Sequence, residues 1–129
     1  MPLLPETQTI LVVDDELTIL SLTQMILTRA GYGVLVAAGG KEVLRLFEVW
    51  PDIKIDLMLV DIVMPDMNGP ALVDLVWRTH PELPVLYVSG YSGKEFMRNE
   101  IARNVPYLEK PFTALQLTTR IREILDRQG

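Results

Sequence analysis

The sequence predicts an α/β fold in which helices cover both faces of one parallel β-sheet. Five short apolar runs, rich in β-branched residues, alternate with helix-length segments whose apolar residues recur at helical spacing. The apolar runs are continuous instead of alternating with polar residues, as in strands that are buried on both faces. Five strands that alternate with five helices imply right-handed crossovers and therefore a doubly wound parallel sheet.

Each predicted strand ends at a polar residue or at a glycine or proline. The predicted ranges are Ile10–Val13, Val34–Ala38, Leu57–Val60, Val85–Val88 and a shorter Val105–Leu108. Their lengths suit strands better than helices, because a buried helix needs a longer apolar segment.

The first three predicted helices are bounded by glycine or proline. The first, residues 17–30, stops at Gly31, and its expected core face consists of Ile19, Leu22, Ile26 and Ala30. The second ends before Pro51 and carries at helical spacing Val43, Leu46, Phe47 and Trp50. The third has Pro70 in its first turn, stops near Pro81 and contains Leu72, Leu75 and Val76.

The last two predicted helices differ in how much apolar surface they offer. The fifth begins after Thr113, a plausible N-cap, and its expected core face consists of Ala114, Leu117, Ile121, Ile124 and Leu125. The fourth, roughly residues 94–102, has few apolar residues among many charged ones. We therefore expect the fourth helix to be the most loosely held.

Length and composition bound the classes of function. With 129 residues, 49% of them hydrophobic, the chain is expected to form one domain over residues 9–127 after a short tail over residues 1–8. The net charge of −5 and the absence of a basic run argue against direct nucleic-acid binding. The chain has no cysteine and no apolar run of membrane-spanning length, so we expect a soluble cytoplasmic protein without a membrane partner.

Chemically competent residues follow four of the five predicted strands. They are Asp14-Asp15-Glu16 after the first strand, Asp61 after the third, Ser89-Gly90 after the fourth and Glu109-Lys110-Pro111 after the fifth. Ligands of open α/β sheets bind beyond the carboxyl ends of the strands, so these residues are expected to converge on one cleft.

Crowded carboxylates need a neutralising cation to stay ionised. Oxygen ligands without His or Cys suit Mg²⁺ or Mn²⁺, and a lysine with a hydroxyl can hold phosphoryl oxygens. An aspartate in such a site can itself be the nucleophile that forms an acyl phosphate.

Taken singly, each of these residues also has an ordinary structural role. Asp14 or Asp15 could be a helix cap, Ser89 a turn residue and Lys110 a solvated loop lysine. Asp61 follows four apolar residues, where burial of an unpaired charge would cost free energy. Because such residues follow four of the five strands, we favour one shared site over four unrelated roles.

Four motifs, in this order, carry a resemblance over residues 10–125. They are ILVVDDE at 10–16, LMLVDIVMPDMNG at 57–69, VLYVSGY at 85–91 and YLEKPF at 107–112. With them the chain resembles a receiver (response-regulator, CheY-like) domain of bacterial two-component signal transduction. The resemblance implies a flavodoxin-like fold, a five-stranded parallel sheet with strand order 2-1-3-4-5.

The resemblance also implies a role for each matched position. Asp61 matches the phosphoacceptor of a Mg²⁺-dependent reaction. The implied protein ligands of the metal are Asp14, Asp15, Asp61 and the backbone carbonyl of Val63. Ser89 and Lys110 match the hydroxyl and the ammonium that meet the phosphoryl group. Tyr107 matches the aromatic switch residue, and Pro111 the proline that usually follows a cis peptide bond.

The implied phosphoryl donor is a sensor histidine kinase or a histidine phosphotransfer protein. Phosphorylation is expected to switch the surface formed by the fourth helix, fifth strand and fifth helix, which acts on an unknown downstream protein, passes the phosphoryl group on or forms a homodimer. We do not expect an enzyme in the usual sense. The domain would catalyse its own phosphorylation and a slow dephosphorylation. The dephosphorylation is expected to be slow because neither Val63 nor Tyr91 can act as a base for the attacking water.

Other functions use parts of the same pattern. A flavodoxin-type electron carrier would need a phosphate-cradling loop where Asp14-Asp15-Glu16 stands, and a haloacid-dehalogenase-type phosphatase would need D-x-D-x-T after its first strand. A receiver-fold module that works without phosphate usually lacks one of the site residues, and this chain has them all.

His80, the single histidine, is expected to be a surface or cap residue and not a phosphorelay histidine. Whether the chain is a single-domain regulator or a fragment of a hybrid kinase or larger regulator stays open.

Overall fold

The computed structural model describes residues 7–90 and 104–128, and within them five parallel strands form one sheet. The strand order is β2-β1-β3-β4-β5, which confirms the predicted 2-1-3-4-5. The strands are β1 (Thr9–Val13), β2 (Gly33–Ala37), β3 (Leu57–Asp61), β4 (Val85–Ser89) and β5 (Tyr107–Glu109). Neighbouring strands pair in register, so that Val13 lies opposite Ala37 in β2 and Val60 in β3.

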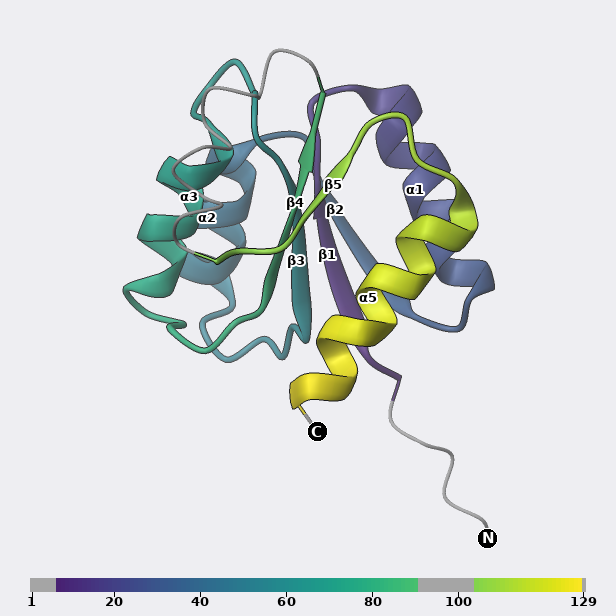
Figure 1. The fold of residues 1–129 in the computed structure, drawn as a ribbon. Coiled ribbons are helices and arrows are strands. Elements are labelled where there is room, and N and C mark those ends of the chain that lie inside the picture. The colour runs from purple at the N-terminus through teal and green to yellow at the C-terminus, as the bar shows by residue number, and fades with distance from the viewer. Residues whose placement is uncertain (1–6, 91–103, 129) are drawn as a thin grey trace, which may run out of the picture.

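The described helices form one layer on each side of the sheet. They are α1 (Leu17–Arg29), α2 (Gly40–Val49), α3 (Gly69–Trp77) and α5 (Ala114–Gln128). Figure 1 shows α2 and α3 on one side of the strands and α1 and α5 on the other. The predicted fourth helix lies outside the described residues.

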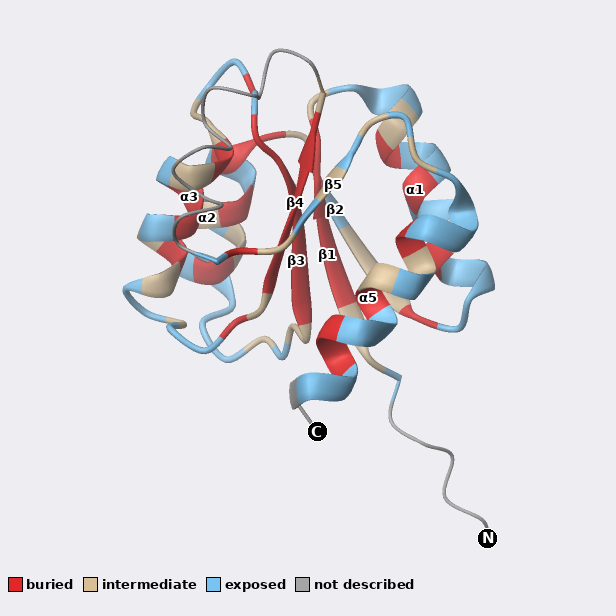
Figure 2. Cartoon of the chain, viewed as in Figure 1, coloured by how far each residue is buried: buried red, intermediate tan, exposed pale blue. Residues whose placement is uncertain are grey.

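The core has two halves, one on each face of the sheet, and Figure 2 shows the central strands β1, β3 and β4 buried along nearly all of their length. Successive strand residues point to opposite faces, so Ile10 and Val12 pack toward α1 and α5 while Leu11 and Val13 pack toward α2 and α3. The three central strands are buried over nearly all of their residues, as the continuous apolar runs predicted.

Side chains or glycine mark several helix ends where the sequence predicts them. Thr113 Oγ1 accepts a hydrogen bond from the Gln116 N–H at 3.0 Å, and Gln116 Oε1 accepts one from the Thr113 N–H at 2.8 Å. This reciprocal pair is a capping box, and it confirms Thr113 as the cap of α5. Gly31 follows α1 with a φ of 98°, a backbone conformation that favours glycine.

The predicted core face of α1 is confirmed only for Ile26, which is partly buried against the core. The buried residues of α1 are Leu20, Thr23 and Leu27, whereas Leu22 is 47% exposed. The reason is that apolar residues occur nearly all around this helix, so helical spacing does not select one face. Trp50 also differs from its prediction, because α2 ends at Val49 and the Trp50 side chain is 56% exposed.

The two edge strands are less buried than predicted. In β2 three residues are partly buried and Val36 is 43% exposed. Strand β5 begins two residues later than predicted, at Tyr107, and is only three residues long. An edge strand has one neighbour instead of two, so less of its surface is covered.

In residues 7–90 and 104–128, no helix combines the length and the hydropathy needed to cross a lipid bilayer.

Candidate functional site

Three carboxylates meet at the carboxyl end of the sheet. Asp14 and Asp15 directly follow β1, and Asp61 is the last residue of β3, the strand beside it. Asp14 and Asp61 are only 4% and 6% exposed, and Asp15 is more open to solvent. One oxygen from each of the three carboxylates lies within 4.8 Å of the others. The parallel sheet therefore brings together residues that are far apart in the sequence.

Lys110 reaches into this cluster from the loop that follows β5. Its Nζ donates to Asp14 Oδ2 at 3.0 Å and to Asp61 Oδ2 at 3.3 Å, and its side chain is 16% exposed. The backbone of Lys110 is fixed as well, because its N–H donates to the Ser89 carbonyl at 2.9 Å. The Lys110–Pro111 peptide bond is cis, as the resemblance implies.

The protonation of Asp61 reflects its surroundings. Burial raises the pKa of the Asp61 carboxyl, the charge of Lys110 opposes this effect, and the charge of Asp14 adds to it, so the pKa rises to about 6. Burial lowers the pKa of Lys110, but the hydrogen bond to Asp14 and the charges of both aspartates more than offset it and raise that pKa above its ordinary value. At pH 7.5 the Asp61 carboxyl is therefore mostly ionised and Lys110 is protonated, with its ammonium between the carboxyl groups of Asp14 and Asp61.

Local backbone bonds fix the orientation of the two buried carboxylates. Asp14 Oδ1 accepts the Glu16 N–H at 2.9 Å, and Asp61 Oδ1 accepts the Val63 N–H at 3.3 Å. The side chain of Asp14 thus spans the turn before α1, whose N-cap is Glu16. The bond from Val63 turns the start of the loop after β3 toward Asp61.

The residues present fit a divalent cation. All donors in the cluster are carboxylate oxygens, which hard cations prefer. Three carboxylates and one ammonium leave two uncompensated negative charges, which a divalent cation would neutralise. The side chains that could hold Mg²⁺ or Mn²⁺ are therefore those of Asp14, Asp15 and Asp61. That the backbone carbonyl of Val63 is a further metal ligand stays a prediction.

The hydroxyl and the aromatic residue of the predicted site lie on β4 and β5. Ser89 is buried at the end of β4, opposite Glu109 of β5, and its Oγ donates to the Gly90 carbonyl at 3.1 Å. Tyr107 lies on the outer strand, and its side chain is 38% exposed. Tyr91 lies outside the described residues.

One contact near the site was missed by the sequence analysis. The Asp66 carboxylate, in the loop between β3 and α3, accepts the N–H of Lys41 at the start of α2 at 2.9 Å. The available signal was the Gly39-Gly40 pair, which starts a helix without providing a capping side chain.

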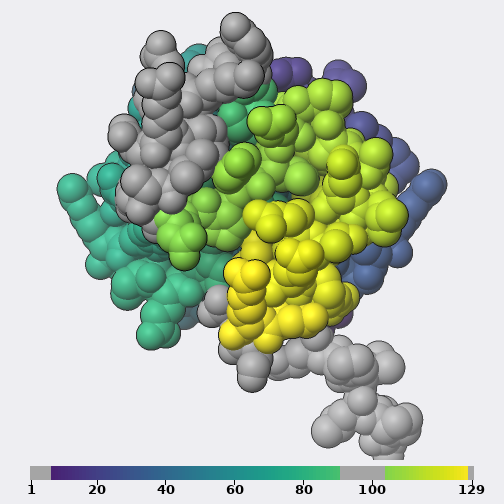
Figure 3. All heavy atoms as spheres, in the orientation of Figure 1, coloured from purple at the N-terminus to yellow at the C-terminus, as the bar shows by residue number. Residues whose placement is uncertain are grey.

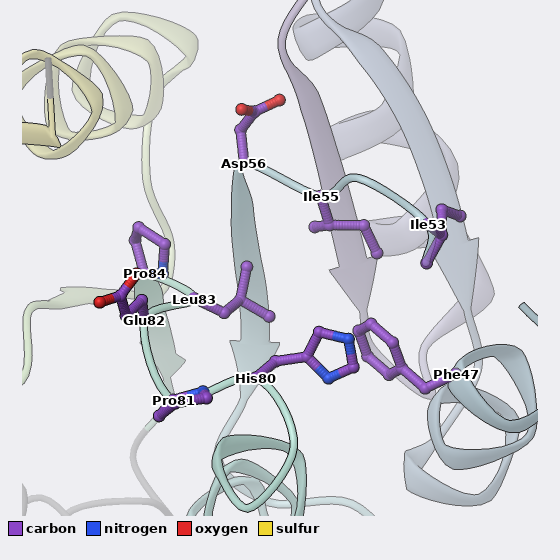
Figure 4. A pocket seen from close by; sticks show the side chains of 9 residues that line it. All are labelled: Phe47, Ile53, Ile55, Asp56, His80, Pro81, Glu82, Leu83 and Pro84. Atoms are coloured by element: carbon purple, nitrogen blue, oxygen red, sulfur yellow. The ribbon is translucent and has the colours of Figure 1, made fainter. Parts of the chain in front are cut away.

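A cavity of about 440 Å³ lies at the opposite end of the strands from the carboxylates. Figure 4 shows His80 and Phe47 facing each other in this pocket, and their ring centroids are 4.5 Å apart. His80 Nε2 also lies 3.2 Å from the Pro51 carbonyl. These contacts agree with a structural role for His80 at the end of α3.

Comparisons with known proteins agree with the fold. A family model described as the response regulator receiver domain matches residues 10–122. Sensor kinase CckA of Brucella abortus (strain 2308) is 37% identical over 121 residues, which are 93% of this chain and 13% of CckA. Transcriptional regulatory protein CpxR of Escherichia coli (strain K12) is 37% identical over 121 residues, 92% of this chain and 49% of CpxR.

The solved structures include similar molecules as well. A CheY-like response regulator receiver domain protein from Methanospirillum hungatei JF-1 superimposes with a TM-score of 0.85 at 33% identity, covering 95% of this chain and 97% of that one. The chain spans less than half the length of CckA and of CpxR, but nearly the whole of this solved structure.

Proposed function

The chain belongs to the response regulator receiver domain family of two-component systems, and we propose that Asp61 is its phosphoacceptor. A carboxylate oxygen of Asp61 attacks the phosphorus of a phosphohistidine. A P–O bond forms, the P–N bond breaks, and its electron pair leaves with the imidazole of the donor. The product is an acyl phosphate on Asp61, and the donor is a sensor histidine kinase or a histidine phosphotransfer protein.

The observation that carries this proposal is the cluster of Asp14, Asp15 and Asp61, whose carboxylate oxygens lie within 4.8 Å of one another. Lys110 donates hydrogen bonds to two of these carboxylates, those of Asp14 and Asp61. Bound Mg²⁺ or Mn²⁺ supplies positive charge to the phosphoryl oxygens and to the attacking carboxylate. Asp14, Asp15 and Asp61, with the carbonyl of Val63, would hold that cation.

Lys110 and Ser89 respond to the change of charge on Asp61. A phosphoryl group carries more negative charge and more acceptor oxygens than a carboxylate. Lys110 already donates to Asp61 and can transfer this hydrogen bond to a phosphoryl oxygen, while the Ser89 hydroxyl can turn from the Gly90 carbonyl toward the same group.

Loss of the phosphoryl group by hydrolysis is slow. Water attacks the phosphorus of the acyl phosphate, the P–O bond to Asp61 breaks, and inorganic phosphate leaves. Val63 lies beside Asp61 with its side chain 38% exposed and offers no group that accepts a proton. The domain therefore catalyses its own phosphorylation and a slow dephosphorylation, and turns over no other substrate.

The output surface includes β5 and α5, which lie together on one face of the molecule in Figure 3. Arg120 of α5 donates to the Tyr107 carbonyl at 3.3 Å and so links the helix to this strand. Tyr107 turns inward when Ser89 moves toward the phosphoryl group. The resulting surface binds a downstream protein or a second copy of the chain.

Two larger contexts suit such a domain, the receiver of a kinase such as CckA or that of a regulator such as CpxR. The cysteine-free composition supports a location in the reducing cytoplasm in either context.

Intact mass spectrometry after incubation with acetyl phosphate tests the proposal. We expect the mass of one phosphoryl group to be gained by the wild type with Mg²⁺, and no gain in EDTA or in Asp61→Asn. Asp52→Asn is the matched control, because Asp52 is an exposed aspartate outside the carboxylate cluster and its loss leaves the phosphorylation intact. No gain by the wild type under any condition would favour a module that works without phosphate.

A further inference from the structure

Asp66 supplies a helix cap from a distant part of the chain. Helix α2 starts after Gly39, and within the described part of the chain it has no capping side chain of its own. Asp66 Oδ2 accepts the N–H of Lys41 at 2.9 Å, across 25 positions of sequence, while Oδ1 accepts the N–H of Met67 at 2.9 Å. The hydrogen bond from Lys41 is the main reason that the pKa of Asp66 is lowered, so the cap is charged at neutral pH.

The fit between this loop and α2 is close. A Cβ added at Gly39 would lie 2.8 Å from Asp66 Oδ2, and one added at Gly40 would lie 2.5 Å from Met67 Cγ. The two glycines therefore allow residues 66 and 67 to lie directly against the backbone at the start of α2.

The same loop begins at the carboxylate cluster. It leaves β3 at Asp61, and its first bond is the one from the Val63 N–H to Asp61 Oδ1. Its other end is fixed at α3, where the Gly69 N–H donates to the Ile62 carbonyl at 2.7 Å. Between these two ends, Asp66 attaches the loop to α2.

We propose that Asp66 is a positioning residue for the cation site, because it holds the loop against α2 and so fixes the backbone of Val63. This inference rests on the proposed function, in which the Val63 carbonyl is one of the cation's ligands. Asp66 itself touches neither the cation nor the phosphoryl group. Its effect is to keep the carbonyl in place before the cation binds.

The inference predicts a loss of cation affinity in Asp66→Ala. Mg²⁺ binding is measured by calorimetric titration at a temperature where every variant is folded, as urea unfolding establishes. We expect Asp66→Ala to weaken Mg²⁺ binding by about tenfold, the lower end of what loss of a ligand-orienting group costs. Asp66→Asn keeps an acceptor oxygen and should restore part of the affinity.

Glu42→Ala is the matched control. Glu42 Oε2 accepts the N–H of Ala38 at the same end of α2, so its loss weakens the start of the helix but not the bond to the loop. We expect Glu42→Ala to lower the free energy of unfolding and to leave the Mg²⁺ affinity unchanged. Equal losses of affinity in Glu42→Ala and Asp66→Ala would overturn the inference, because helix stability alone would then account for them.

A second variant tests the contact from the other side. Gly39→Ala places a methyl group against Asp66 Oδ2, so as a single variant it should weaken Mg²⁺ binding. In the double variant it should add little to the loss that Asp66→Ala already causes. Amide hydrogen exchange of residues 62–67 without cation should be faster in Asp66→Ala than in the wild type. Unchanged exchange and unchanged affinity would refute the positioning role.

Different results would contradict the proposed function and the positioning role of Asp66. A wild type that neither binds Mg²⁺ nor gains a phosphoryl group contradicts the proposed function itself. A wild type that does both, with an Asp66→Ala variant of equal Mg²⁺ affinity, contradicts only the role of Asp66.

Discussion

Replacing Asp61 with asparagine should stabilise the metal-free protein, and the gain should grow with pH. A carboxyl whose pKa is raised by folding keeps its proton more tightly in the native state than in the unfolded state. The contribution of Asp61 to the free energy of unfolding is therefore most favourable at low pH and falls as pH rises through the interval from 3.8 to about 6. Asparagine resembles the protonated carboxyl and carries no charge, so Asp61→Asn avoids this loss.

The size of the effect follows from the two pKa values. Each pKa unit corresponds to about 1.4 kcal/mol, so a rise from 3.8 to about 6 costs the wild type about 3 kcal/mol at pH 7.5. At pH 4.5 the same linkage gives a cost of only about 1 kcal/mol. We expect Asp61→Asn to exceed the wild type in free energy of unfolding by about these amounts.

Urea unfolding in EDTA, followed by tryptophan fluorescence, measures both proteins from pH 4.5 to 8. The Trp77 indole N–H donates to the Leu83 carbonyl at 2.9 Å, so this fluorophore reports on tertiary structure. The reasoning is refuted if the difference between the proteins is independent of pH, or if the wild type is the more stable at pH 7.5.

Asp66→Asn is a control of opposite sign in the same assay. The pKa of Asp66 is lowered, mainly by the Lys41 N–H, so its carboxylate contributes stability above pH 3.8 that disappears as pH falls through the folded-state pKa. This variant should be less stable than the wild type by a nearly constant amount from pH 8 to 4.5, and the difference should shrink only in a further measurement below pH 3.8.

Three further predictions concern single side chains. Val63→Asn should speed loss of the phosphoryl group several-fold, since an amide can hold water near Asp61; a decay that is unchanged or slower by mass spectrometry would contradict this. Lys110→Ala should destabilise the metal-free protein by about 3 kcal/mol at pH 7.5, because two buried carboxylates lose their partner. It should still accept some phosphoryl groups, but without the amide NMR shifts in β5 and α5 that the wild type shows. Trp77→Phe should lower the free energy of unfolding in urea, followed by circular dichroism, by about 1 kcal/mol, because the hydrogen bond to the Leu83 carbonyl is lost.

The sequence alone predicted the central strands and the residues at their ends. A continuous apolar run such as Leu57–Val60 is stable only where both faces of a strand are covered, which requires a parallel sheet between two layers of helices. Asp61 at the end of that run, and Asp14 and Asp15 after another, then fall at the same edge. This inference needs only chain direction and strand pairing, and the structure confirms that the three carboxylates meet there.

The tertiary structure decided which of several apolar faces is buried. In α1, Leu22 and Leu27 are equally hydrophobic, but only Leu27 is fully buried against the sheet. Local sequence does not distinguish them, because the choice depends on how the helix is rotated against strands that are remote in the sequence. The exposure of Val36 has a similar cause, since β2 has a neighbour on one side only.

The contact of Asp66 with α2 also depended on the tertiary structure. An aspartate in a loop that contains proline and glycine is an ordinary turn residue, and nothing in its neighbourhood names a partner 25 positions away. The two elements approach closely because α2 and α3 pack side by side on one face of the sheet. The sequence by itself determined which chemical groups reach the site, because strand order and direction place them at one edge. Only the tertiary structure decided which side chains hold them in position, because those contacts join segments that no local pattern relates.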